Sequence, residues 1–379
     1  MSWSKNYEKI PCLEDGIFAL KTLKKIENIY DRDLEKKWLE TMFASMAWFS
    51  VCGLRRTGKT TLVRSIADAL ERFSVIYLNA WELPEESVFE SFLERLRDEV
   101  ISHLEMQKLK SLARRIRRLS FLGVSVEIRD KSQLKLVGAL KELIKTKPLI
   151  IIIDEAPYLL ETKKAQKFFA ALHDVYVPKL LIVFTGSIIT LKHIYEKNET
   201  RPLYGRIEEE ITLEPFDEYN SRRYLETGFK QCGIEPPQEL IEAAILRLGG
   251  FPGWLTLLGR IATRQKLVLG KINTQETIKE LEERASKVVI GEIAKFLRLK
   301  RNFKIYIKIL KKISIEAEST LTEISRAISR DPSTTTFYLD QLTLHGIVKK
   351  TGKTYQIPDP ILRKTIQKPN FEKEVKIRL

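Results

Sequence analysis

Short apolar runs alternate with stretches of helical spacing through the first 213 residues. The runs have the length of β-strands and lie at 47–52, 74–80, 148–153, 180–184 and 207–213. After the first run, Leu62, Val63 and Ile66 recur at the spacing of one helix face. Strands that alternate with helices predict an α/β fold with a parallel sheet.

The third run strengthens this prediction. It contains four consecutive isoleucines, from Ile150 to Ile153, with no alternation of apolar and polar residues. A strand of this kind is buried on both faces, as in a parallel sheet covered by helices.

The pattern changes after residue 214. It is wholly helical from Phe216 to about Gly291. Helices are then predicted at 302–313, 321–329 and 332–344, and strands at 347–350 and 354–357. Three helices followed by a two-stranded hairpin are typical of a winged helix-turn-helix. We therefore predict an α/β domain at 1–214, a helical lid at 215–291 and a winged-helix domain at 292–379.

The first strand leads into Gly53-Leu54-Arg55-Arg56-Thr57-Gly58-Lys59-Thr60, which fits the phosphate-binding pattern G-x-x-x-x-G-K-[ST]. A strand before the loop and a helix after it favour a phosphate loop over a chance glycine-rich turn, because backbone N–H groups and the helix N-terminus then surround the phosphate. A second Gly-Lys-Thr tripeptide, at 352–354, lacks the first glycine and precedes a strand, so we predict a turn there.

The side chains of the phosphate loop have expected roles. Lys59 reaches the β- and γ-phosphates, the hydroxyl of Thr60 coordinates Mg²⁺, and Thr61 contacts the α-phosphate. The expected nucleotide contacts of the loop are Gly53, Leu54, Arg55, Arg56, Thr57, Gly58, Lys59, Thr60 and Thr61. The implied cofactors are ATP or ADP and Mg²⁺.

Acidic and hydroxyl residues follow two further strands. Asp154 and Glu155 end the isoleucine run, and ligands of parallel sheets gather at the carboxyl ends of strands. We expect Asp154 to hold Mg²⁺ through water and Glu155 to polarise the attacking water, although such a pair is also a common helix cap. The fourth run ends in Thr185-Gly186-Ser187, where we assign γ-phosphate sensing to Ser187; a turn with a capping serine is the alternative.

The formal net charge of +15 is unevenly distributed. From Glu292 to Leu379 there are 19 Lys and Arg against 9 Asp and Glu, and 19 minus 9 gives +10. A basic end of this kind suggests nucleic acid as a partner, and solvated lysine-rich faces are the alternative. Between Pro332 and Leu344 the predicted recognition helix carries Asp340 as its only charge. Any duplex binding is therefore expected to be weak, sensitive to salt and independent of sequence, and a pure packing role is the alternative.

Three cysteines, Cys12, Cys52 and Cys232, are far apart in the sequence and have no metal-ligand spacing. They indicate reduced thiols and no zinc site. No run approaches the roughly 18 apolar residues of a membrane span, and the N-terminus lacks the apolar segment of a signal peptide. We expect a cytoplasmic protein with no membrane partner.

With these motifs in order, the chain resembles the archaeal ATPase family within the STAND branch of the AAA+-like P-loop NTPases. Besides the two phosphate-site motifs, the likeness rests on residues 29–35, 185–187, 204–206, 250–252 and 359–363. Residues 29–35 resemble the h-h-G-R-E-x-E motif beside the adenine, where the resemblance implies a contact for Arg32. This chain departs from the motif at Asp31 and Asp33, which replace Gly and Glu.

The resemblance implies a nucleotide-dependent switch. In this class ADP holds a closed form, in which lid and winged helix fold over the nucleotide, and exchange for ATP opens it. Pro252 is implied to line the adenine pocket, and Arg206 to sense the γ-phosphate.

We therefore expect an ATPase that converts ATP and water slowly to ADP and phosphate, with an unknown protein partner. One alternative is a DNA-handling ATPase resembling archaeal replication initiators. Another is a winged-helix regulator in which ATP tunes DNA binding.

Overall fold

The computed structural model describes residues 11–19, 26–118, 131–175, 177–186, 202–298 and 300–379. The chain forms two compact units. The first, here called the sheet unit, comprises residues 32–55 and 59–213. The second, here called the helical unit, comprises the chain up to residue 31, residues 56–58 and residues 214–379. The middle of the phosphate loop thus belongs with the helical unit.

A parallel sheet forms the centre of the sheet unit. Its described strands, in the order β2-β3-β4-β1-β5, are all parallel to their neighbours. They are β1 (Phe49–Gly53), β2 (Ser74–Asn79), β3 (Leu149–Asp154), β4 (Leu180–Gly186) and β5 (Glu209–Leu213). Every residue of the inner strands β1, β3 and β4 is buried, as the isoleucine run predicts, whereas the edge strands β2 and β5 are partly exposed. The predicted parallel sheet is confirmed.

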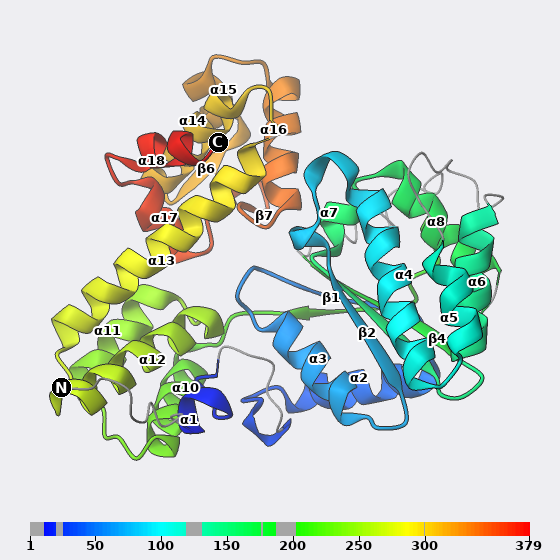
Figure 1. Ribbon diagram of the computed structural model, residues 1–379. Coiled ribbons are helices and arrows are strands. Elements are labelled where there is room, and N and C mark those ends of the chain that lie inside the picture. Colours follow the sequence, from blue (N-terminus) through cyan, green and yellow to red (C-terminus); the bar gives the residue numbers. More distant parts are fainter. Residues whose placement is uncertain (1–10, 20–25, 119–130, 176, 187–201, 299) are drawn as a thin grey trace, which may run out of the picture. The chain divides into compact units, whose positions relative to one another are not determined.

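Helices cover both faces of this sheet. Figure 1 shows α2 and α3 on one face and α4, α6 and α8 on the other, as right-handed crossovers between parallel strands require. Phe43 of α2 contacts Phe49 with ring centroids 5.6 Å apart, and Phe169 of α8 contacts Phe184 at 5.3 Å. The helices are α2 (Asp33–Ser45), α3 (Lys59–Ala69), α4 (Val88–Met106), α5 (Lys110–Arg117), α6 (Lys131–Leu143), α7 (Ala156–Leu160) and α8 (Lys163–Asp174).

The helical unit includes a short N-terminal segment that packs on two of its helices, α10 and α12. Phe18 is fully buried in a notch between Gly228 and Gly259, where an added Cβ would lie 2.4 Å from its ring. Arg260 donates hydrogen bonds to the carbonyl oxygens of Leu13 and Phe18 at 2.6 and 2.9 Å. The elements are α1 (Pro11–Glu14), α10 (Glu218–Gln231), α11 (Gln238–Leu248), α12 (Pro252–Leu269) and α13 (Thr274–Leu297).

Two of the three cysteines form a disulfide, so the expectation of reduced thiols is wrong for them. Cys12 in α1 is bonded to Cys232 at the end of α10, with 5.3 Å between the Cα atoms. They are 220 residues apart, so sequence spacing could not reveal that the N-terminal segment brings them together. Cys52, the third, is a free thiol buried in β1.

The disulfide is expected to stabilise the helical unit, because it closes a long loop and limits the unfolded chain. Such bonds typically contribute about 2–4 kcal/mol. A reductant should therefore lower the melting temperature of the wild-type protein, and should have no effect on a Cys232→Ser variant that already melts at the lower temperature. Equal melting temperatures of oxidised and reduced wild-type protein would contradict this.

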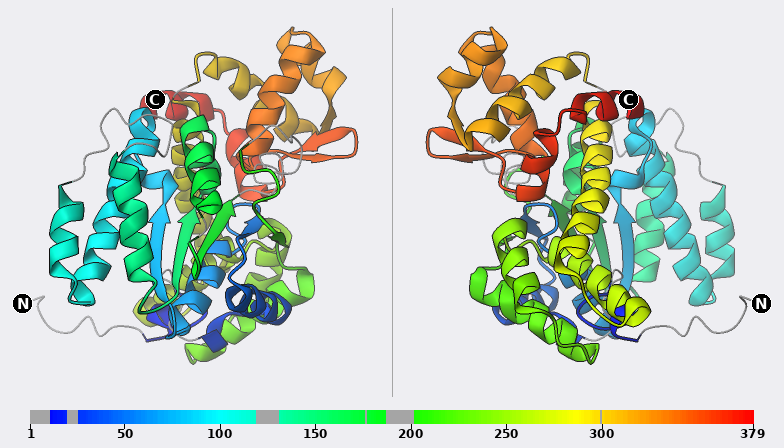
Figure 2. Two further views of the ribbon diagram at one scale, coloured as in Figure 1. Left: turned by 90° about the vertical axis from the view of Figure 1, so that its right-hand side faces the viewer. Right: turned by 90° about the vertical axis from the view of Figure 1, so that its left-hand side faces the viewer.

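Residues 303–356 contain the elements predicted from the sequence and one more. Helices α14 (Phe303–Glu316), α15 (Leu321–Ile328) and α16 (Pro332–Leu344) accompany an antiparallel sheet of β6 (Glu318–Thr320), β8 (Thr354–Gln356) and β7 (Lys349–Thr351), in that order. Figure 2 shows the β7–β8 hairpin projecting beyond the helices. Gly352, with φ +58°, forms the turn predicted for the second Gly-Lys-Thr tripeptide. Three polar residues make up β6, which left no hydrophobic pattern to predict it.

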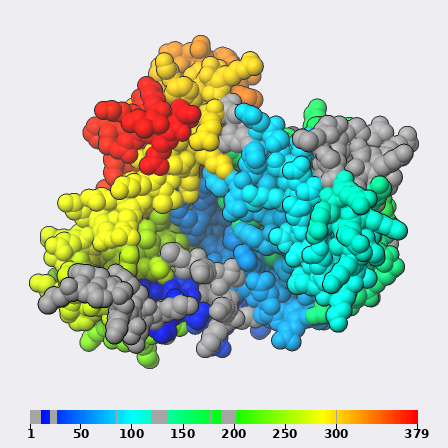
Figure 3. All heavy atoms as spheres, viewed as in Figure 1, coloured from blue at the N-terminus to red at the C-terminus, as the bar shows by residue number. Residues whose placement is uncertain are grey.

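The last helices pack on α13, which is a continuous helix of 24 residues through position 291. Figure 3 shows α17 (Pro360–Ile366) and α18 (Phe371–Arg378), in red, against α13, in yellow. The predicted lid and winged-helix segments are thus joined by a helix rather than by an irregular linker.

Candidate functional site

The phosphate loop connects β1 to α3 with the backbone geometry that its glycines allow. β1 ends at Gly53 and α3 begins at Lys59. Gly58 has φ +92°, a conformation that side chains with a Cβ rarely adopt, and Arg56 also lies in the left-handed region at φ +67°. The loop therefore reaches the helix N-terminus in the strand-loop-helix order expected for anion binding.

Lys59 is held inside the loop. Its side chain is buried, and its Nζ donates hydrogen bonds to the carbonyl oxygens of Gly53 and Leu54 at 2.9 and 2.7 Å. Burial lowers the pKa of Lys59, and the nearby carboxylates of Glu155 and Asp154 oppose that shift. The ammonium group thus lies among backbone groups of the loop. A phosphate oxygen can replace the two carbonyl oxygens as its hydrogen-bond acceptor.

Asp154 is the most heavily hydrogen-bonded carboxylate of the site. Its Oδ2 accepts hydrogen bonds from the hydroxyls of Thr60 and Tyr77, both at 2.7 Å. Its Oδ1 accepts from the hydroxyl of Thr185 and from the backbone N–H of Glu155, the latter at 3.1 Å. These groups come from α3, β2 and β4, and from the residue after β3. Donors at the carboxyl ends of the parallel strands therefore converge on the carboxylate of Asp154.

Thr60 and Asp154 fit a magnesium ion by their chemistry. Mg²⁺ prefers oxygen ligands and binds through one or two protein groups together with substrate phosphates and water. A threonine hydroxyl and a carboxylate within 2.7 Å of each other, at the start of α3 and the end of β3, supply such oxygens. The two residues that the sequence assigns to the metal are thus brought together.

Glu155 has an unusual backbone conformation. It has φ +50° and precedes the short helix α7, with Pro157 in its first turn. Non-glycine residues in this region carry strain of order 1–3 kcal/mol, and such residues cluster at functional sites. The carboxylate follows Asp154 directly, so both acids lie at the carboxyl end of β3.

The other predicted site residues either belong to different units or lie outside the described residues. Ser187 lies outside the described residues. Arg32 precedes α2 and forms an ion pair with Glu35 at 2.9 Å. Pro252 is the first residue of α12 and belongs to the helical unit, whereas Arg32 belongs to the sheet unit.

Arg206 is not brought together with Lys59 and Asp154. Its guanidinium binds the carboxylate of Asp174 at 3.0–3.1 Å. Asp174 ends α8 shortly before β4 begins, and Arg206 lies shortly before β5 begins. Because the strands are parallel, their first residues all lie at one end of the sheet, opposite to the end that carries the phosphate loop. Gamma-phosphate sensing by Arg206 stays a prediction.

Arg56 is the centre of a network within the helical unit. Its guanidinium forms ion pairs with Glu292 at 2.6 Å and Asp359 at 3.2 Å, and lies 4.0 Å from the ring centroid of Trp254. Trp254 donates its Nε1 hydrogen to Asp359 at 3.0 Å. Asp359 also caps α17 by accepting hydrogen bonds from two backbone N–H groups. Burial raises the pKa of the Asp359 carboxyl, and the positive charge of Arg56 opposes this shift.

Several of these groups could not be assigned from the sequence. Tyr77 and Trp254 have the residue types of core positions. Glu292 and Asp359 are more than 200 residues from Arg56 along the chain. Asp359 begins the segment 359–363, and its sequence position offered no sign of its partner. Thr185 lies two residues before Ser187 at the end of the fourth strand, and its hydroxyl donates a hydrogen bond to Asp154.

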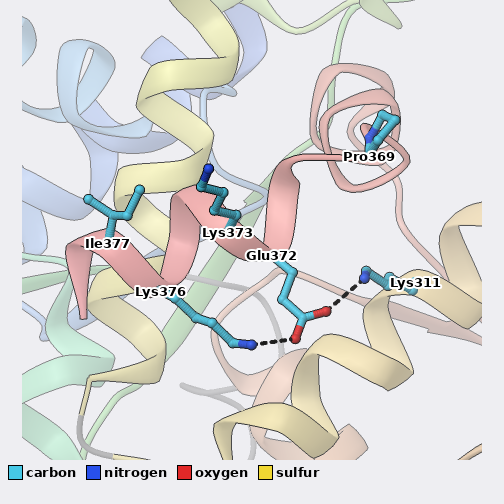
Figure 4. A pocket seen from close by; sticks show the side chains of 6 residues that line it. All are labelled: Lys311, Pro369, Glu372, Lys373, Lys376 and Ile377. Carbon is cyan, nitrogen blue, oxygen red and sulfur yellow. Dashed lines mark hydrogen bonds and ion pairs between the residues drawn. The ribbon is translucent and has the colours of Figure 1, made fainter.

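A separate open pocket lies between α14 and α18 (Figure 4). Its volume is about 480 Å³, and its lining residues are Lys311, Pro369, Glu372, Lys373, Lys376 and Ile377. Two of the three lysines that line the pocket, Lys311 and Lys376, form ion pairs with the carboxylate of Glu372. Their hydrogen bonds lower the pKa of Glu372 to about 2. The pocket contains none of the phosphate-site motifs.

A parallel sheet with β4 between β1 and β3, a phosphate loop after β1 and an acidic pair after β3 define a P-loop ATPase. The chain belongs to the family described as an ATPase domain predominantly from Archaea, which it matches over residues 29–258.

The chain is also similar to solved structures and to one curated protein. A Walker-type ATPase of Pyrococcus abyssi is 25% identical, with a TM-score of 0.73, and the match covers 93% of this chain and 100% of that one. The ORC2 protein of Aeropyrum pernix, solved as ADPNP and ADP complexes, is 15% identical with a TM-score of 0.56, covering 95% and 97% of the two chains. An energy-coupling factor transporter ATP-binding protein of Streptococcus thermophilus is 25% identical over 52% of this chain and 86% of its own length.

Across the part of the chain that the structure describes, we find no helix with the length and apolar character of a membrane span.

Proposed function

We propose that this ATPase is a nucleotide-dependent switch that hydrolyses ATP slowly. The observation that carries the proposal is the network around Arg56. A residue in the middle of the phosphate loop forms two ion pairs with Glu292 and Asp359, from helix α13 and the cap of helix α17. A change in the loop on nucleotide exchange would therefore act directly on residues of the helical unit.

The network is buried enough for such a change to matter. The side chain of Arg56 is 13% exposed, and those of Glu292 and Asp359 are 28% and 8% exposed. Removing one partner of a buried ion pair typically costs about 3–5 kcal/mol, because the other charge stays buried without compensation. The backbone is linked as well, since Gly253 of α12 donates its N–H to the carbonyl oxygen of Arg56 at 3.1 Å. ADP and ATP, which differ at the γ-phosphate, would favour different arrangements of these contacts.

In the proposed reaction, Lys59 binds the β- and γ-phosphates and Glu155 orients and polarises the attacking water. Thr60 and Asp154 would hold Mg²⁺, which when bound neutralises charge on the phosphates. Ser187 is proposed to sense the γ-phosphate, and Arg32 and Pro252 to contact the adenine. The family resemblance also assigns γ-phosphate sensing to Arg206, although this residue lies at the end of the sheet opposite to the phosphate loop of its own chain. These four assignments rest on the family resemblance and on sequence position.

Limited proteolysis tests the switch. Residues 214–217 connect β5 to α10, and ADP should protect this connection from protease better than a non-hydrolysable ATP analogue does. Arg56→Ala should abolish the difference between the two nucleotides. Arg247→Ala is the matched control, because this arginine also forms an ion pair within the helical unit, with Glu282 at 3.2 Å, but lies outside the phosphate loop and should leave the difference unchanged. Identical cleavage of the wild-type protein with both nucleotides would reduce the proposal to a plain ATPase.

DNA binding has weaker support. Two lysines of the basic C-terminal part have partners within the protein: Lys300 donates to Gln341 at 2.9 Å, and Lys311 pairs with Glu372 at 2.9 Å. Helix α16 has an exposed aromatic residue, Phe337, where base-reading helices generally have Arg, Lys, Asn or Gln. The ORC1 protein of Aeropyrum pernix, solved in complex with DNA, shares the fold at 16% identity and a TM-score of 0.51 over 97% and 98% of the two chains. We therefore keep two secondary proposals: weak contact with a DNA backbone, and contact with an unknown protein partner.

A further inference from the structure

Tyr77 is a polar contact of the nucleotide site that the motifs do not include. It lies in β2, the edge strand beside β3, and its hydroxyl donates a hydrogen bond to Oδ2 of Asp154 at 2.7 Å. The same oxygen accepts the hydroxyl of Thr60 at 2.7 Å. One carboxylate oxygen thus serves both the proposed metal-binding threonine and a tyrosine that has no role in the phosphate motifs.

The sheet register explains why Tyr77 reaches this position. Tyr77 pairs with Ile152 and Asn79 pairs with Asp154, so Tyr77 lies on the same face as Asp154, two positions before the end of the strand. A phenol ring spans this distance along the strand, whereas shorter side chains at this position would not.

Helix α3 holds the ring of Tyr77 as well. The guanidinium of Arg64 lies 4.5 Å from the ring centroid, and Arg64 is one helical turn after Thr60. The first turns of α3 therefore contact Tyr77 at its ring and Asp154 at its carboxylate. A tyrosine hydroxyl is protonated at neutral pH, so Tyr77 is a hydrogen-bond donor toward Asp154.

We propose that Tyr77 is a positioning residue for magnesium binding, which fixes the direction of the Asp154 carboxylate toward the place where Thr60 binds the metal. It would touch neither the metal nor the nucleotide. Groups that orient a metal-binding side chain in this way typically change metal affinity by about 10- to 100-fold when they are removed. The inference rests on the proposed magnesium role of Thr60 and Asp154.

The test measures binding of ADP, so that no hydrolysis enters. ADP affinity is determined by calorimetry without Mg²⁺ and at increasing Mg²⁺ concentrations, for wild type and Tyr77→Phe. The variant keeps the ring against Arg64 and removes only the hydroxyl. It should need about 10- to 100-fold more Mg²⁺ to reach the affinity gain of the wild type, with unchanged affinity for ADP alone. Tyr355→Phe, which removes a hydroxyl from buried Tyr355 of β8 in the helical unit, should behave as wild type.

Three outcomes would overturn the inference. An unchanged Mg²⁺ requirement would show that the hydroxyl does not position Asp154. A lower Mg²⁺ requirement would show that the hydroxyl of Tyr77 competes with metal-bound water for Oδ2 of Asp154. An equal loss of affinity for ADP alone would make Tyr77 a structural residue of the site. Thr60→Val separates this inference from the proposed function, because the magnesium proposal itself fails if that variant keeps the full Mg²⁺ dependence.

Discussion

Glu155→Gln is expected to bind ATP as the wild type does and to lose nearly all turnover. Gln keeps the size of the side chain, but its amide cannot accept a proton from water. General base catalysis typically contributes about 100- to 10,000-fold, and the rate of phosphate release should fall by that amount. Binding should be unaffected, because the role assigned to Glu155 concerns the attacking water and not the phosphates.

Calorimetry with ATP and a phosphate-release assay separate the two parts of this prediction. Full turnover by Glu155→Gln would remove the assignment of the base. Loss of ATP binding would instead point to a structural role for the residue, whose backbone lies in the left-handed region before α7.

Lys59→Ala is expected to abolish tight binding of ATP. The variant removes the ammonium group that now binds the carbonyl oxygens of Gly53 and Leu54, and so leaves the phosphates without their charged partner in the loop. Truncating one partner of a buried charged pair costs about 2–5 kcal/mol or more, which corresponds to a loss of affinity of at least about 30-fold.

The chain contains its own control for this variant. Lys353 lies in the second Gly-Lys-Thr tripeptide, where Gly352 forms the turn between β7 and β8. Lys353→Ala should leave ATP affinity unchanged. Retention of wild-type affinity by Lys59→Ala would contradict the assignment of the phosphate loop.

The strands and the core of the phosphate site could be predicted because each has a local signal. A run of isoleucines predicts a strand buried on both faces, and the structure buries all of β3. The order of a phosphate loop and an acidic pair, each after a strand, places Thr60 and Asp154 at one edge of a parallel sheet, where they lie within hydrogen-bonding distance.

Contacts between distant segments have no such signal. Cys12 and Cys232 meet through the packing of the N-terminal segment, which carries no motif. Arg56 was expected to contact the nucleotide, and its ion pairs with Glu292 and Asp359 join segments more than 200 residues apart. Arg206 shows a different limit of sequence analysis. Its segment, 204–206, resembles a family motif, yet it lies at the end of the sheet opposite to the phosphate loop.

Nucleotide affinity tests the central claim most directly, because a ligand shifts a conformational equilibrium only by its different affinities for the two forms. ADP and a non-hydrolysable ATP analogue should be titrated by calorimetry into wild type and Arg56→Ala. Wild type should bind ADP at least about tenfold more tightly, a difference of roughly 1.4 kcal/mol, and Arg56→Ala should bring the two affinities together. An equal change of both affinities in Arg56→Ala would show that the network around Arg56 does not distinguish the two nucleotides, and would contradict the switch.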